Sequence, residues 1–178
     1  MTFLVNWRSA LGRSMLLRKL QKNSVNRQTL ALDSIKNIGL VGSGTDAEYA
    51  QWTKMTKKVF GNEMNVKWLW QSSEKETALE SDDNLIVLDK KGYSFFFQPK
   101  PDILKAFNDQ KNELILCFDK EPSQVLINFL ALSNAKYRVG YMGPHDYSFE
   151  LMLDMSDKQT IAHFISEAHK YIKLMNPS

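Results

Sequence analysis

The sequence predicts an α/β protein, a three-layer Rossmann-like sandwich with a mainly parallel central sheet and a basic N-terminal helix. Segments of strand character alternate with segments of helical periodicity from about residue 35 onward, which is the pattern of an α/β sandwich. The sequence ELILCF at 113–118 is a continuous apolar run, as expected for a central strand that is covered on both faces.

The composition indicates a protein that folds in water around one core. The chain has 178 residues, of which 43% are hydrophobic and 24% are charged, close to the averages for globular proteins. These values exclude fibrous and disordered classes. No repeat and no Pro/Gly/Ser-rich linker divides the chain. We expect residues 1–34 to form a basic helix and a connector, and residues 35–178 to form a single α/β domain.

The first half of the chain predicts two strands around a capped helix. Thr45 and Glu48 form a T-x-x-E capping box, in which the hydroxyl accepts from a backbone N–H and the carboxylate reaches back. A helix therefore starts near Asp46, and Gly61-Asn62 ends it. The predicted elements are a helix at 6–21, a strand at 35–41, the capped helix and a strand at 65–71.

The second half predicts a hairpin and then further helices and strands. The apolar segments 84–89 and 93–98 flank Lys90-Lys91-Gly92, which is a signal for a β-hairpin. Pro101 suits the first turn of a short helix. The remaining predicted elements are a strand at 113–118, a helix at 122–135, strands at 136–142 and 148–155, and a last helix with a capping box at Ser156 and Gln159.

A glycine-rich loop follows the first predicted strand of the sheet, with glycines at 39, 42 and 44. A loop in this position can bind a phosphate, because the next helix offers free N–H groups. However, the spacing is G-x-x-G-x-G, no Lys-Ser pair follows, and Gln71 stands where a dinucleotide site has an acid. A tight turn is therefore favoured. The alternative is a phosphate or nucleotide site formed by Gly42, Ser43, Gly44, Thr45 and Asp46.

Asp119 follows the most buried predicted strand and would lie at the same sheet edge as the glycine-rich loop. A carboxylate there can act as a base or hold a hydroxyl. It can equally be a solvated strand end that favours the next helix through its dipole. The three histidines have no carboxylate or cysteine at metal-ligand spacing, and no nucleophilic triad can be assembled. We therefore predict no catalytic residues, no metal site and no cofactor.

Charge and cysteine content bear on location and partners. Residues 1–36 hold seven Lys or Arg and one Asp, a net charge of +6, which leaves −3 for the rest because the whole chain carries +3. Contact with nucleic acid or an anionic membrane surface through residues 8–27 is an open alternative, although the cations are spread around the helix. The lone Cys117, the lack of a signal-like N-terminus and the lack of a long apolar segment predict a cytoplasmic protein without a transmembrane segment.

One part of the chain resembles a known family. A buried strand ending at Asp119, an apolar helix and the sequence SNAKYRVG at 133–140 are similar to the N-terminal half of heptosyltransferase-type (GT-B) glycosyltransferases. The resemblance implies a Rossmann-like half-enzyme without the second domain, which binds the nucleotide sugar in that family. It would give Asp46 the place of the catalytic aspartate. The whole chain more closely resembles a small family of uncharacterised bacterial proteins of this length.

These observations favour a non-catalytic cytoplasmic α/β domain that acts through a protein partner or by forming a homo-oligomer. The basis is a well-specified fold without a convergent set of catalytic residues. The alternative is a phosphate or nucleotide-sugar binding protein related to the N-terminal half of a glycosyltransferase. In that case the anion would bind at residues 42–46.

Overall fold

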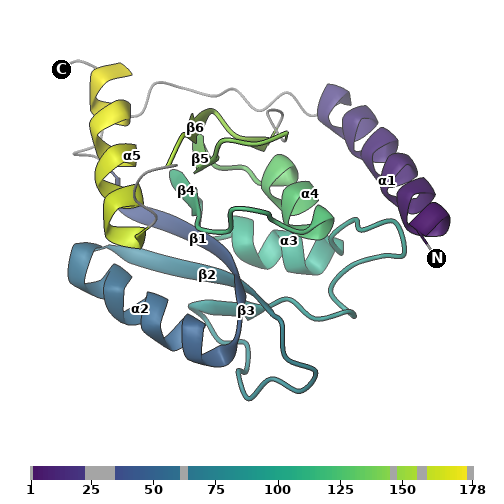
Figure 1. Cartoon of the computed structure of the whole chain (residues 1–178), viewed down its shortest axis with the longest axis horizontal. Coiled ribbons are helices and arrows are strands. Elements are labelled where there is room, and N and C mark those ends of the chain that lie inside the picture. The colour runs from purple at the N-terminus through teal and green to yellow at the C-terminus, as the bar shows by residue number, and fades with distance from the viewer. Residues whose placement is uncertain (1, 23–34, 61–63, 145–147, 156–159, 176–178) are drawn as a thin grey trace.

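The computed structural model describes residues 2–22, 35–60, 64–144, 148–155 and 160–175, which hold five helices and six strands (Figure 1). The helices are α1 (Thr2–Lys22), α2 (Asp46–Phe60), α3 (Pro101–Asn108), α4 (Gln124–Leu132) and α5 (Ile161–Met175). The strands are β1 (Asn37–Gly44), β2 (Asn65–Ser72), β3 (Leu85–Val87), β4 (Leu114–Cys117), β5 (Tyr137–Tyr141) and β6 (Leu151–Leu153).

The six strands form one sheet in the order β3-β2-β1-β4-β5-β6, and every neighbouring pair is parallel. The predicted α/β fold is thus confirmed. The predicted strand at 113–118 is β4, which lies between β1 and β5 and whose four residues are all buried. Its apolar sequence follows from this position, because helices cover both faces of the sheet.

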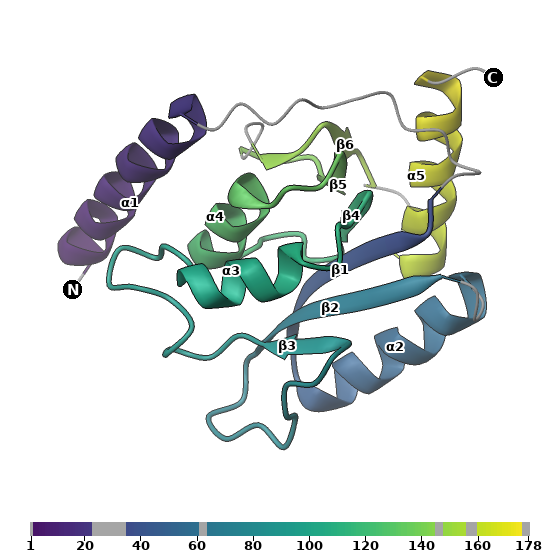
Figure 2. The ribbon, with the colours of Figure 1, turned by 180° about the vertical axis from the view of Figure 1, so that it is seen from behind.

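The layers are clear from two opposite views (Figures 1 and 2). α2 and α5 pack on one face of the sheet, around Trp68, Leu116 and Phe164. α3 and α4 pack on the other face, around Leu69 and Ile115. Successive residues of a strand point to opposite faces, which is why the neighbours Trp68 and Leu69 belong to different layers.

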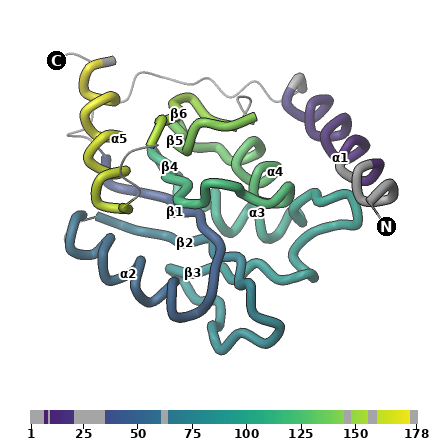
Figure 3. Tube along the Cα trace, in the orientation of Figure 1, coloured from purple at the N-terminus to yellow at the C-terminus, as the bar shows by residue number. Residues whose placement is uncertain are grey.

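α1 lies outside α4, on the side away from the sheet, and at the opposite end of the molecule from α5 (Figure 3). The Arg8 guanidinium donates to the carbonyl oxygen of Phe95 at 2.8 and 3.0 Å. Gln98 donates from its side-chain amide to the carbonyl oxygen of Gly12 at 3.0 Å. Because α1 covers the outer side of α4, residues 125–131 are all buried, and this segment is correspondingly apolar on almost every side.

The predicted hairpin at 84–98 is wrong. Its first segment contains β3, which pairs in parallel with β2 and not with the residues that follow. After β3 the chain turns at Asp89, whose carboxylate accepts from the N–H of Gly92 at 3.0 Å. Phe97 adopts a positive φ of 59°, which interrupts any regular strand. Residues 93–98 therefore form an irregular loop.

The glycine-rich loop is also different from the prediction, because β1 continues through it. The strand predicted at 35–41 runs to Gly44, and its last residues pair with β2. Gly42 lies opposite Trp70, and Gly44 lies opposite Ser72. The glycines are thus the end of a central strand. Four other elements are shorter than predicted. α4 was predicted at 122–135 and β6 at 148–155, and β4 and β5 are each one residue shorter at both ends than the predicted 113–118 and 136–142.

The capping box that starts α2 is confirmed. The N–H of Thr45 donates to Glu48 Oε2 at 2.7 Å, and the N–H of Glu48 donates to Thr45 Oγ1 at 3.2 Å. At the start of α5, Thr160 Oγ1 accepts from the N–H of His163 at 3.2 Å. Two predictions lie outside the described residues: the capping box at Ser156 and Gln159, and the helix end at Gly61-Asn62.

Candidate functional site

The strand order defines where a ligand binds in folds of this kind. From β1 the chain continues through β2 and β3 toward one edge of the sheet, and from β4 it continues through β5 and β6 toward the other. The neighbours β1 and β4 form the topological switch point, and ligands bind beyond their carboxyl ends in open α/β sheets. Ser43 and Gly44 end β1, and Asp119 follows β4. The fold thus brings the two predicted sites together.

Ser43 and Asp119 contact each other across the switch point. Ser43 Oγ donates a hydrogen bond to Asp119 Oδ2, and Asp119 Oδ1 accepts from the N–H of Glu121 at 3.1 Å. Both carboxylate oxygens of Asp119 therefore have partners within the protein. The sequence left open whether this carboxylate acts as a base, holds a hydroxyl or is a solvated strand end. In the structure it accepts a hydrogen bond from the hydroxyl of Ser43.

Gly42 and Gly44 leave room for neighbouring side chains. A Cβ on Gly42 would lie 2.8 Å from the ring of Trp52 and 2.9 Å from the ring of Trp70. A Cβ on Gly44 would lie 2.5 Å from Glu48 Oε2, and Gly44 has a φ of +153°, which side chains rarely allow. Packing within the protein is thus sufficient to explain both glycines.

Carboxylates of the protein occupy N–H groups at the start of α2. Glu48 holds the N–H of Thr45 through the capping box, and Glu74 Oε1 accepts from the N–H of Asp46 at 3.2 Å. A phosphate at this helix start would use these same N–H groups. It would have to displace two carboxylates or lie beside them.

Asp46 ties the start of α2 to the polar loop after β2. Its Oδ1 accepts from Thr77 Oγ1 at 2.7 Å and from Ser72 Oγ at 3.1 Å, and its Oδ2 accepts from the N–H of Ala78 at 2.8 Å. Desolvation alone would raise the pKa of Asp46, but the hydrogen bonds from Thr77, Ala78 and Ser72 outweigh it and lower the pKa below its ordinary value. The carboxylate is therefore ionised and held by the loop.

A second polar contact, between Gln71 and Ser123, crosses the same edge of the sheet. Ser123 Oγ donates to Gln71 Oε1 at 2.6 Å, and the same hydroxyl accepts from the N–H of Leu126 at 3.4 Å as the N-cap of α4. Sequence analysis missed this contact. The available signal was a serine directly after Pro122 and before an apolar helix, which is typical of an N-cap.

Cys117 and Tyr141 lie near Asp119 in an apolar setting. The Cys117 thiol donates to the carbonyl oxygen of Asp119 at 3.8 Å, and burial raises the pKa of this thiol to about 12. Burial, with smaller contributions from Cys117 and Asp119, also raises the pKa of Tyr141 to about 12. Both groups are neutral at physiological pH, and a neutral thiol is a poor nucleophile.

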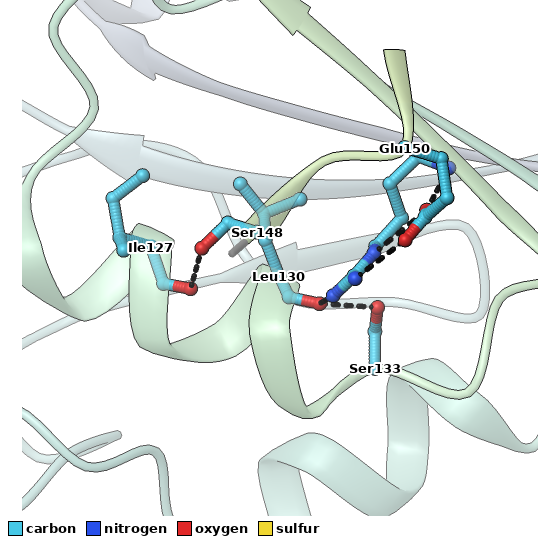
Figure 4. Close-up of polar contacts among 6 residues, drawn as sticks. Ile127, Leu130, Ser133, Ser148 and Glu150 are labelled. Atoms are coloured by element: carbon cyan, nitrogen blue, oxygen red, sulfur yellow. Dashed lines mark hydrogen bonds and ion pairs between the residues drawn. The ribbon is translucent and has the colours of Figure 1, made fainter. Parts of the chain in front are cut away.

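A buried ion pair joins β5 to α4 and to the segment before β6. Arg138 is fully buried, and its guanidinium donates to Glu150 at 2.8 and 3.1 Å and to the carbonyl oxygen of Leu130 at 2.6 Å (Figure 4). All three guanidinium nitrogens thus have acceptors within the protein, so this side chain links β5, α4 and the segment before β6. Sequence analysis missed this pair, although an arginine inside the apolar strand YRVGY was its signal.

Neither a metal cluster nor a membrane-spanning helix is present among the described residues. The part of the chain that the structure describes contains no group of three or more His, Cys, Asp or Glu side chains able to hold a metal ion. His163 is half-buried and His169 is exposed, whereas His145 lies outside the described residues. Among the described helices, none has the length and apolar character that crossing a membrane requires.

The outer face of α1, defined as Trp7, Leu11 and Met15, is a second candidate region. These residues recur at every fourth position and are 51%, 36% and 41% exposed. Gly12 and Leu16, on another side of the same helix, are buried. α1 therefore has one apolar side that packs on the protein and another that faces solvent.

The wholly parallel sheet with the order β3-β2-β1-β4-β5-β6 defines a Rossmann-like α/β protein. Residues 8–175 match DUF6913, which is described as a family of unknown function, and the chain belongs to this family. No curated protein and no solved structure matches the chain. The match to the family includes most of α1 together with the sheet.

Proposed function

We propose that this protein is a non-catalytic α/β domain that acts by self-association, with the outer face of α1 as its contact surface. The observation that carries the proposal is that α1 exposes Trp7, Leu11 and Met15 in one row while a different side packs on the protein. An apolar stripe on a helix is a common means of docking. Tryptophan is also among the residues that contribute most to interfaces.

Charge indicates which surface of a second copy the helix would contact. α1 contains five Lys or Arg and no Asp or Glu, so two α1 helices would repel each other. Residues 74–83 carry the opposite charge. This segment contains one exposed lysine, Lys75, and five exposed acidic residues, namely Glu74, Glu76, Glu80, Asp82 and Asp83. The proposed contact is therefore head-to-tail, from α1 of one copy to residues 74–83 of the next.

Two further observations support a binding role over a catalytic one. At the switch point, Ser43 is engaged by Asp119, and Ser123 is engaged by Gln71. The proposal includes a bacterial source and a cytoplasmic location. The location is supported by the single cysteine of the chain, which is buried and unpaired. It also includes the division into a basic helix with its connector, 1–34, and an α/β domain, 35–178.

Sedimentation velocity of the full chain over a range of concentrations tests the proposal. The expected result is a sedimentation coefficient that rises with concentration at low salt. The rise should become smaller at high salt, because ions screen the contact between basic and acidic surfaces. A chain that sediments as a monomer at every concentration and at low salt would contradict the proposal.

A second candidate function is the binding of a phosphate or nucleotide sugar at residues 42–46, as in a protein related to the N-terminal half of a glycosyltransferase. The observation that favours it is the position of these residues at the switch point. The carboxylates of Glu48 and Glu74 at the start of α2 oppose it. Replacing Glu74 would therefore strengthen any real anion site.

A thermal-shift panel of nucleotides, nucleotide sugars and sugar phosphates tests this second function. If the site binds an anion, an active compound raises the melting temperature, E74Q increases the shift and Gly44→Val abolishes it. A panel in which nothing stabilises the unmodified chain or E74Q excludes the function.

Contact of residues 8–27 with nucleic acid or an anionic membrane stays a further alternative, and residues 23–27 lie outside the described part of the chain. It predicts binding to a DNA duplex or to phosphatidylserine vesicles that weakens steeply as salt increases.

A further inference from the structure

A cavity of about 850 Å³ lies between α2 and α5, at the amino ends of β1 and β4. It is therefore at the sheet edge opposite the switch point. Most of its wall is apolar, including Ile38, Val59, Phe60, Leu116, Ile165 and Ile172. The floor consists of buried core residues, since Ile38 and Leu116 are each 1% exposed. The size is in the range of small-molecule binding sites.

The described wall of this cavity carries one lysine and no acidic residue. Among the described residues that line it, Lys36, Ser166 and His169 are polar and none is acidic. Glu113 lies next to a lining residue in the sequence, but its carboxylate is engaged. It accepts from the N–H of Lys36 at 2.7 Å and pairs with Lys136 at 3.5 Å. An anionic group at the cavity would therefore meet Lys36 and His169 without facing an unpaired acid in the described wall.

We propose that this cavity binds a long-chain carboxylate. Water gains few hydrogen bonds in an apolar cavity, so an apolar occupant is favoured there. An acyl chain would lie between α2 and α5 against Ile38, Leu116 and Ile165, and its carboxylate would contact Lys36 and His169. The combination of an apolar wall with the ammonium group of Lys36 fits an amphipathic anion better than it fits a neutral lipid or a nucleotide. A neutral lipid would leave the lysine unpaired, and a nucleotide would leave the apolar wall uncovered.

This site shares no residue with the outer face of α1 or with residues 42–46. A ligand in the cavity would therefore contact other residues than self-association or anion binding at the switch point does, and each of the three can be tested with its own variants.

Isothermal titration calorimetry of the full chain with dodecanoate, below its aggregation concentration, tests the inference. The expected result is saturable binding at one site per chain, with weaker binding of dodecanol. Ser166→Trp places a large ring in the cavity from an exposed position of α5 and should weaken dodecanoate binding at least tenfold. Lys173→Trp is the matched control, because Lys173 is an exposed α5 residue outside the cavity wall, and it should bind as the unmodified chain does.

Lys36→Met separates the role of the charge from that of the cavity. The variant should lose up to about fivefold in dodecanoate affinity and keep its affinity for dodecanol, because an exposed ion pair contributes modestly. Circular dichroism checks that each variant is folded. The inference is overturned if the unmodified chain shows no saturable binding, if Ser166→Trp and Lys173→Trp bind equally, or if Lys36→Met leaves the preference for dodecanoate unchanged.

Discussion

Ser43 and Asp119 join the carboxyl ends of β1 and β4 through a hydrogen bond from a hydroxyl to a carboxylate. Proteins with this strand order bind ligands at the same place. In this protein the two side chains at the switch point form a hydrogen bond with each other. We therefore expect their replacement to change the stability of the fold.

Ser43→Ala should lower the free energy of unfolding by about 1–2 kcal/mol, because it leaves one oxygen of the half-buried Asp119 without its donor. Urea unfolding measures the loss. In a double-mutant cycle with Asp119→Asn, the two changes should be non-additive. Additive changes would mean that the contact does not contribute to stability.

Gly44→Ala should destabilise the protein by more than about 1 kcal/mol, because Gly44 has a positive φ and a Cβ would approach Glu48 Oε2 to 2.5 Å. Gly143→Ala is the matched control, since the nearest atom to its Cβ would be 4.0 Å away. Thermal unfolding compares the two variants. Equal melting temperatures would contradict the packing explanation for the glycine-rich sequence.

Glu150→Ala should destabilise the protein by about 3–5 kcal/mol, because it leaves the charge of the buried Arg138 without its partner. The double variant R138M/E150L removes both charges and should recover much of this loss. Urea unfolding of the two variants provides the comparison. If the double variant were less stable than Glu150→Ala, the cost would not come from an unpaired buried charge.

Stability should fall at acid pH, in part through Asp46. Its pKa in the folded protein lies below the ordinary value of 3.8, because hydrogen bonds outweigh desolvation. The stabilising effect is therefore present above pH 3.8 and is lost as pH falls through the lower folded-state pKa. The pKa of Glu113 is also lowered from its ordinary value of 4.5. Desolvation alone would raise this pKa, but the hydrogen bonds from the N–H groups of Lys36 and Asn37 and the charge of Lys136 outweigh it.

Asp46→Asn should consequently make unfolding less dependent on pH below about pH 4, while the contribution of Glu113 remains. Urea unfolding of the variant and the unmodified chain at several values of pH measures the two slopes. Identical slopes would show that Asp46 has the same pKa in the folded and unfolded chains.

Local sequence patterns predicted the elements whose signals are local. The apolar run of β4 and the capping box at Thr45 and Glu48 are examples, since each depends on residues within one turn or one strand. The prediction of a hairpin was wrong in its pairing. The segment that forms β3 has recognisable strand character, but it pairs with β2, from which a polar loop separates it in the sequence. Pairing partners are not encoded in the local pattern.

The candidate site was predicted only in part for a similar reason. The sequence predicts residues 42–46 as the loop after one strand and Asp119 as the end of another, and a parallel sheet brings both to one edge. Their mutual contact spans 76 positions of sequence, and the contact of Ser123 with Gln71 spans 52. Such contacts depend on strand order, which the sequence analysis did not determine.

Two leucines of α1 test whether its outer face is a contact surface. Leu11 belongs to the outer face, whereas Leu17 lies outside it. The two side chains are exposed to a similar degree, 36% for Leu11 and 41% for Leu17. Sedimentation equilibrium of Leu11→Glu and Leu17→Glu at low salt measures the self-association of each. If the outer face is the contact surface, Leu11→Glu is monomeric and Leu17→Glu associates as the unmodified chain does. Equal association of the two variants would rule out the outer face of α1 as the contact surface.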